Sequence, residues 1–134
     1  MTREQLFALM ARLPEVQPLF EATGGTHAAA LASPDGGVFL AAEDIGRHNA
    51  LDKVIGHCLL RNMDMTQMVA LLSGRISFEM ALKAVRAGIP LLAAVSAPTT
   101  MALELAQALN LTLVGFARRD RMSVYTHPER ITEL

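Results

Sequence analysis

The stretch that decides the fold is residues 68–99, which read MVALLSGRISFEMALKAVRAGIPLLAAVSAPT. Its apolar runs 68–72 and 91–95 have the length and composition of fully buried strands. Between them, residues 77–87 have the pattern of an amphipathic helix, which the glycine that follows should end. Buried strands joined by a helix are typical of parallel pairing with a right-handed crossover. The stretch therefore indicates an α/β protein.

On both sides of this stretch the same periodicities predict further elements. In chain order they are a helix within 2–20 that ends near Pro14, hairpin strands 26–33 and 37–42, a helix over 51–59, a helix over 100–109, and strands 111–116 and 123–126. Together they predict a three-layer α/β fold with a mainly parallel or mixed sheet. We expect residues 1–22 to be a lead-in helical segment and residues 23–134 to be a single domain.

Composition excludes several classes of protein. The 134 residues are 51% hydrophobic and 19% charged, which argues against intrinsic disorder. Twelve Lys and Arg against thirteen Asp and Glu leave a net charge of -1, so we expect no broad electrostatic binding to nucleic acid. No apolar run is long enough for a membrane helix, and no targeting segment is evident. We expect a cytoplasmic protein that does not bind membranes.

Polar residues gather at predicted strand-to-helix junctions, where open parallel sheets bind ligands. The first group is Thr23, Gly24, Gly25 and His27. Adjacent glycines allow backbone amides to approach a ligand closely, and the hydroxyl and imidazole offer hydrogen bonds. The alternative interpretation is a tight turn with a structural histidine.

The second group is Asp44, Arg47, His48, Asn49 and Lys53. Asp44 is placed to orient Arg47 or His48, and an arginine at a helix amino-terminus can bind a phosphate through two hydrogen bonds. The alternative is that Asp44 caps the helix and the others face water.

The third group is Ser73, Gly74 and Arg75, and Ser96 and Thr99 occupy the equivalent place after the next strand. We therefore expect these hydroxyls to lie near one another, beside an arginine that suits a phosphate or another oxyanion. Helix capping alone is the alternative explanation for the serines and threonines.

Motifs of the common nucleotide and metal enzymes are absent from the sequence. There is no Walker phosphate loop, no dinucleotide fingerprint and no His-Glu-x-x-His pair. The single cysteine, Cys58, lies on the apolar stripe of its predicted helix, so we expect a buried, inert thiol.

The three polar groups also carry a resemblance. Residues 23–29, 43–53 and 73–79 read TGGTHAA, EDIGRHNALDK and SGRISFE, and in this order they closely resemble the FdhD/NarQ family, accessory sulfurtransferases for formate dehydrogenase. Residues 96–99 and 113–116, SAPT and LVGF, extend the resemblance.

The resemblance implies a cytidine-deaminase-like domain that binds the molybdenum bis-guanine-dinucleotide cofactor, of which GDP is a partial mimic. The polar groups above would line its site, with Lys83 as a weaker candidate. The resemblance also implies a homodimer, a cysteine desulfurase as sulfur donor, and formate dehydrogenase as the client enzyme.

Members of the family carry sulfur on a Cys-x-x-Cys loop upstream of the Thr-Gly-Gly motif, and this sequence has no such loop. We therefore expect the carboxyl-terminal, cofactor-binding part of an FdhD-type protein, and whether this chain is itself an enzyme stays open. One alternative is a non-enzymatic scaffold that docks the desulfurase or formate dehydrogenase. Another is a zinc deaminase, but its His-x-Glu and Pro-Cys-x-x-Cys ligands are missing from the helix starts.

Overall fold

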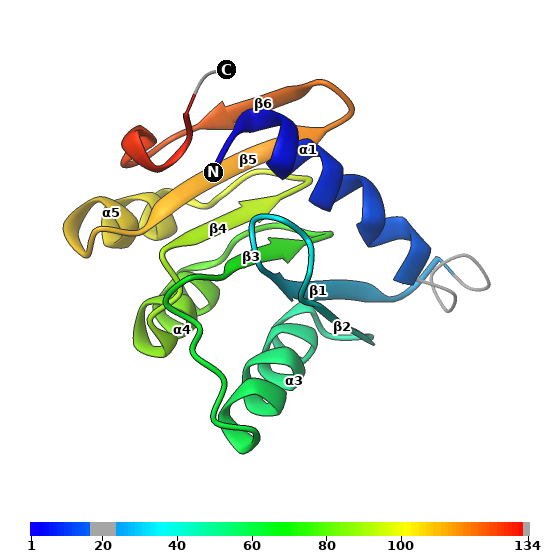
Figure 1. Cartoon of the computed structure of the whole chain (residues 1–134). Coiled ribbons are helices and arrows are strands. Elements are labelled where there is room, and N and C mark those ends of the chain that lie inside the picture. Colours follow the sequence, from blue (N-terminus) through cyan, green and yellow to red (C-terminus); the bar gives the residue numbers. More distant parts are fainter. Residues whose placement is uncertain (17–23, 133–134) are drawn as a thin grey trace.

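The computed structural model describes residues 1–16 and 24–132 (Figure 1). Its elements, in chain order, are α1 (Arg3–Arg12), the 3-10 turn η1 (Leu13–Val16), β1 (His27–Ala32), β2 (Phe39–Asp44), α3 (Arg47–Leu60), β3 (Val69–Leu72), α4 (Phe78–Ala87), β4 (Leu91–Ala94), α5 (Thr100–Ala108), β5 (Thr112–Arg118), β6 (Arg121–Val124) and the 3-10 turn η2 (Pro128–Arg130).

The strands form one six-stranded sheet in the order β2-β1-β3-β4-β5-β6. Strands β3, β4 and β5 are parallel to one another. Strand β1 runs antiparallel to both β2 and β3, and β6 runs antiparallel to β5. The two antiparallel additions are hairpins, whose short connections cannot join parallel neighbours. The expected mixed sheet is confirmed, and its parallel part is limited to three strands.

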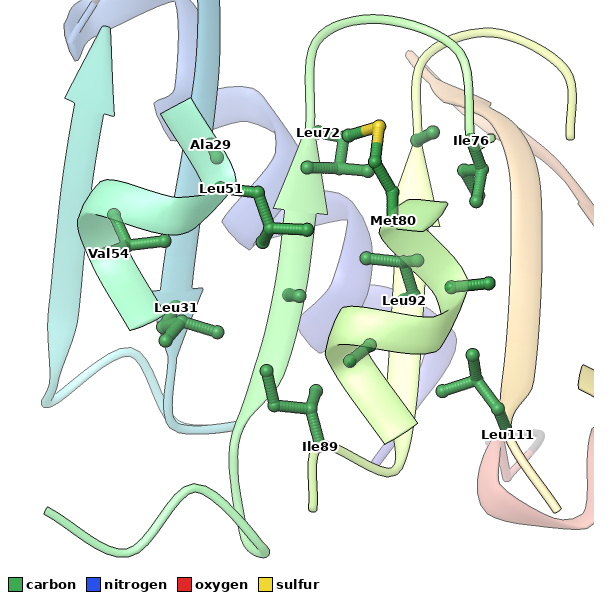
Figure 2. Close-up of a cluster of buried hydrophobic side chains, with 14 of the residues drawn as sticks. Ala29, Leu31, Leu51, Val54, Leu72, Ile76, Met80, Ile89, Leu92 and Leu111 are labelled. Atoms are coloured by element: carbon green, nitrogen blue, oxygen red, sulfur yellow. The ribbon is translucent and has the colours of Figure 1, made fainter. Parts of the chain in front are cut away.

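Helices cover both faces of the sheet, which confirms the three-layer arrangement (Figure 1). Helices α3, α4 and α5 pack on one face over a core that includes Leu51, Met80 and Leu92 (Figure 2). Helix α1 packs on the other face, where Leu6 and Leu71 belong to one buried hydrophobic cluster. Successive strand residues point to opposite faces, and both faces are buried, so each central strand is apolar throughout.

The element boundaries follow the sequence patterns closely around the central stretch. The Ser77 hydroxyl accepts a hydrogen bond from Met80 N–H at 3.3 Å and caps α4, and Gly88 ends that helix with a φ of 80°. The amino-terminal helix α1 ends at Arg12, with Leu13 as its C-cap, which agrees with the predicted end near Pro14. Strand β5 continues two residues beyond the predicted end at Phe116.

The helices also bear on two further expectations, one about the burial of Cys58 and one about membrane-spanning segments. Cys58 is fully buried in α3, and this burial raises the pKa of its thiol. Within the described residues, no helix is both long and apolar enough to cross a membrane.

A close approach in the sheet predicts the outcome of one substitution. A Cβ atom on Gly115 would lie 3.0 Å from Pro98 Cδ and 3.2 Å from the Ser96 carbonyl oxygen, neither of which can swing aside. We expect Gly115→Ala to lower the free energy of unfolding by about 1–3 kcal/mol, measured by urea denaturation. Gly56→Ala is the matched control, because no atom lies within 4 Å of its added Cβ and alanine favours helix by up to about 1 kcal/mol. Equal stability of the two variants would contradict the packing described.

Candidate functional site

The polar groups of the sequence meet at one end of the sheet. Asp44, which ends β2, pairs with His27, which begins β1, and Leu72 of β3 pairs with Ala94 of β4. We name the segments around these residues the polar edge, defined as residues 24–27, 43–49, 73–77 and 96–99. Three helices also begin there, since α3, α4 and α5 follow the last three segments. Thr23 lies outside the described residues.

Backbone hydrogen bonds join two loops of the polar edge. Ile76 N–H donates to the Ala97 carbonyl at 3.3 Å, and Thr99 N–H donates to the Ile76 carbonyl at 2.9 Å. The loop of Ser73 and Arg75 therefore lies beside the loop of residues 96–99, as the sequence predicts.

Several hydroxyls of the polar edge already have structural partners. The Ser73 hydroxyl accepts a hydrogen bond from Ala28 N–H at 2.8 Å, and the Thr99 hydroxyl accepts one from Ala102 N–H at 3.2 Å. Thr26 is only 9% exposed, and its hydroxyl donates a hydrogen bond to Glu43 Oε2 at 2.7 Å. Capping and loop bracing thus describe these side chains better than ligand binding does.

Asp44 organises the start of α3. Its carboxylate pairs with Lys53 Nζ at 2.7 Å and accepts hydrogen bonds from Gly46 N–H at 3.0 Å and Asn49 Nδ2 at 3.3 Å. Lys53 is the largest cause that lowers the pKa of Asp44 to about 2. Asp44 therefore orients neither Arg47 nor His48, contrary to one interpretation of the sequence, because its carboxylate is engaged by Lys53 in the second turn of α3.

His48 connects two helix starts. Its Nε2 lies 2.8 Å from the Ser77 hydroxyl, which also caps α4.

Lys83 of α4 likewise links the two helices, because its Nζ lies 2.7 Å from both carboxylate oxygens of Asp52 in α3. Lys83 is engaged in this ion pair and is a poor candidate for ligand binding.

Arg47 lies in a space that Gly74 leaves open. A Cβ atom on Gly74 would lie 3.1 Å from His27 Nδ1 and 3.8 Å from Arg47 Cδ, so the imidazole and the arginine stem both approach this loop closely. Arg47 Nε is buried and has no hydrogen-bond partner among the described residues. A buried donor of this kind is costly without an acceptor, and a ligand oxygen would supply one. Nearby, Gly24 has a φ of 70°, a left-handed backbone conformation that glycine adopts without strain.

A cavity beside the polar edge has a lining that the sequence analysis missed. It has a volume of about 900 Å³ and is lined by Arg3, Phe116, Arg118, Arg119, Asp120, Arg121, Met122 and Ser123. We name it the arginine cavity. It adjoins the polar edge, because Phe116 N–H donates to the Ser96 carbonyl at 3.2 Å. The signal in the sequence was the run Arg-Arg-Asp-Arg at 118–121, which spans the turn from β5 to β6.

Within the described part of the chain, no arginine of this cavity forms an ion pair with a carboxylate. The ion pairs between described residues join Lys53 to Asp44, Lys83 to Asp52 and His127 to Glu129. Arg118, Arg119 and Arg121 take part in none of them, and neither does Arg75 of the polar edge. Exposed guanidinium groups that lack acidic partners are well suited to phosphate oxygens.

The residues at the helix starts do not form a zinc cage of the deaminase type. Across residues 1–16 and 24–132, no three His, Cys, Asp or Glu side chains are grouped so that they could hold a metal. His48 is hydrogen-bonded to the Ser77 hydroxyl, and Cys58 of α3 is part of the buried core.

Comparison with protein families gives one match over almost the whole chain. The model of the FdhD/NarQ family matches residues 1–132. A sulfur carrier protein FdhD from Halalkalibacterium halodurans is 50% identical over 131 residues, which is 98% of this chain and 48% of that protein. The FdhD of Mycobacterium tuberculosis is 52% identical over 130 residues, 96% of this chain and 47% of that protein. The chain spans about half the length of the curated relatives it matches.

Solved structures agree with the fold. A crystal structure described as a formate dehydrogenase accessory protein, from Desulfotalea psychrophila, has a TM-score of 0.90 at 32% identity, over 98% of this chain and 59% of that one. Guanine deaminase from Nitrosomonas europaea has a TM-score of 0.61 at 11% identity, over 90% of this chain and 79% of that one. The second likeness concerns the fold alone, and it confirms the expected deaminase-like α/β architecture.

The Asp44 ion pair generates a prediction about titration. We expect Lys53→Met to raise the pKa of Asp44 from about 2 toward its usual 3.8, because the largest stabilising partner of the carboxylate is removed. The carboxylate is favoured in the folded state, so its contribution to stability is complete above pH 3.8 and is lost as the pH falls toward 2. Carboxyl NMR titration measures the shift. Lys83→Met removes the other lysine ion pair and should leave Asp44 unchanged; a Lys53→Met variant with unaltered Asp44 titration would refute the assignment.

Proposed function

Because the chain belongs to the FdhD/NarQ family, we propose that it is the part of an FdhD-type sulfur carrier that binds the molybdenum bis-guanine-dinucleotide cofactor. The bound cofactor would present its molybdenum centre as the acceptor of sulfur. This chain would supply the surface that holds the guanine dinucleotide, in support of formate dehydrogenase.

The observation that carries the proposal is the arginine cavity. Its lining contains four arginines and one carboxylate, Asp120, and Phe116 N–H joins it to the loop before α5 by donating to the Ser96 carbonyl at 3.2 Å. A guanine dinucleotide contains a pyrophosphate group, whose oxygens accept paired hydrogen bonds from guanidinium groups. Positive charge without internal partners is therefore present where a phosphate-rich ligand would need it.

The polar edge supports the same ligand class. Arg47 Nε is a buried donor that has no partner among the residues that the structure describes, and Arg75 is exposed in the neighbouring loop. The amino-termini of α3, α4 and α5 add the partial positive charge of helix dipoles at this end of the sheet. We assign cofactor binding to these arginines, and loop bracing to Ser73, Thr99, Asp44 and His48.

The proposal assigns this chain the binding step only. A sulfur-carrying thiol has to be accessible and readily deprotonated. Cys58 is fully buried and its pKa is raised, so it does not meet these requirements. We propose that a cysteine desulfurase supplies the sulfur, that the protein is a cytoplasmic homodimer, and that formate dehydrogenase is the recipient.

The state of Cys58 also favours a second candidate, a scaffold that docks the desulfurase or formate dehydrogenase without transferring sulfur. The two functions differ in their ligand. A scaffold of this kind would recover a partner protein in a pull-down and would have no affinity for guanine nucleotide.

Calorimetric titration with GDP tests the proposed function. We expect the native chain to bind GDP, and we expect Arg47→Gln and Arg121→Gln each to weaken binding roughly tenfold or more, since one charge-assisted hydrogen bond contributes about 1.5–3 kcal/mol. Arg86→Gln is the matched control, because this exposed arginine lies in the last turn of α4 and lines neither the polar edge nor the arginine cavity. No GDP binding by the native chain, or equal binding by all three variants, would defeat the proposal.

A further inference from the structure

Arg3 lies far from the predicted site in the sequence but lines the arginine cavity in the structure. It is the first residue of α1, which packs on the face of the sheet opposite α3, α4 and α5 (Figure 1). The other arginines of the cavity come from the β5–β6 hairpin, at positions 118, 119 and 121. Two separate elements therefore contribute positive charge to one cavity.

The position of Arg3 is set by contacts on both sides of it. Before it, Thr132 N–H donates to the Met1 carbonyl at 2.8 Å, which ties this end of the chain to the segment after η2. After it, Leu6 is completely buried between α1 and the sheet. A capping box closes the start of the helix, with Gln5 N–H donating to the Thr2 hydroxyl at 3.0 Å. Arg3 is thus carried by a well-anchored first turn.

No carboxylate engages Arg3 among the described residues. Its guanidinium carbon lies 5.7 Å from the centroid of the Phe7 ring. The four cavity arginines supply four positive charges and Asp120 supplies one negative charge, which leaves a net of three positive charges. A cluster of like charges is unfavourable unless an anion binds between its members.

We propose that Arg3 is a phosphate-binding residue, which contacts the pyrophosphate group of the ligand together with the hairpin arginines. This inference rests on the proposed function and deepens it, because it makes the amino-terminal helix a part of the binding site. The ligand class is a pyrophosphate, held from α1 and from the β5–β6 hairpin at once. Arginine suits such a role because its planar fork can donate two parallel hydrogen bonds to one phosphate.

The test measures calorimetric affinities for GDP, inorganic pyrophosphate and guanosine in the native chain and three variants. We expect Arg3→Gln to weaken GDP and pyrophosphate binding at least fivefold, and to leave any guanosine binding unchanged. Arg3→Lys keeps the positive charge but lacks the planar guanidinium group, so its affinity for GDP and pyrophosphate should lie between those of the native chain and Arg3→Gln. Arg86→Gln, the exposed arginine of α4, should match the native chain. Thermal unfolding of each variant checks that α1 remains folded, and both the capping box and Leu6 are left intact.

Equal GDP and pyrophosphate affinities of Arg3→Gln and Arg86→Gln would overturn the inference, and the proposed function would stand if both still bind GDP. Pyrophosphate binding that depends on Arg3, in a chain with no affinity for GDP, would support the inference and overturn the proposed function. A native chain that binds neither GDP nor pyrophosphate would overturn both.

Discussion

The pairing of the two loops that follow β3 and β4 is the contact on which the site depends. Ile76 is fully buried, and its backbone N–H and carbonyl both bond to the neighbouring loop, at 3.3 Å to Ala97 and 2.9 Å to Thr99. Gly115 lets β5 approach the same loop, where a side chain would collide with Pro98. Because of these contacts, the ends of three parallel strands form one continuous edge, and polar groups far apart in the sequence share a surface.

Residues of this edge divide into those that build it and those that remain available to a ligand. Ser73, Thr99 and the Asp44–Lys53 pair are engaged in capping, bracing or ion pairing. Among residues 1–16 and 24–132, Arg118, Arg119 and Arg121 form no ion pair, and Arg47 has an unpaired Nε donor. Binding by arginines that a rigid polar frame holds in place is the physical basis of the proposed function, and it requires no thiol from this chain.

The sequence predicts the local elements well and the long-range arrangement less well. Strand β3 and helix α4 follow from an apolar run, a serine cap and Gly88, which are all local signals. The place of β1 between β2 and β3 is not local, because it depends on where the chain re-enters the sheet after the crossover through α3. The polar edge was predictable from the rule that ligands bind at strand ends. Arg3 was not, since nothing in a sequence pattern shows that α1 reaches the cavity beside β6.

One measurement tests the central claim directly, namely that guanine nucleotide binds at the polar edge and the arginine cavity. It is the change in backbone amide NMR shifts when GDP is added to the labelled chain. The account predicts that the shifts concentrate in residues 46–48, 74–77, 96–99 and 116–121, at one end of the sheet. Shifts that concentrate at the opposite end, around Gln67 and Leu91, or a spectrum that GDP does not change, would contradict it.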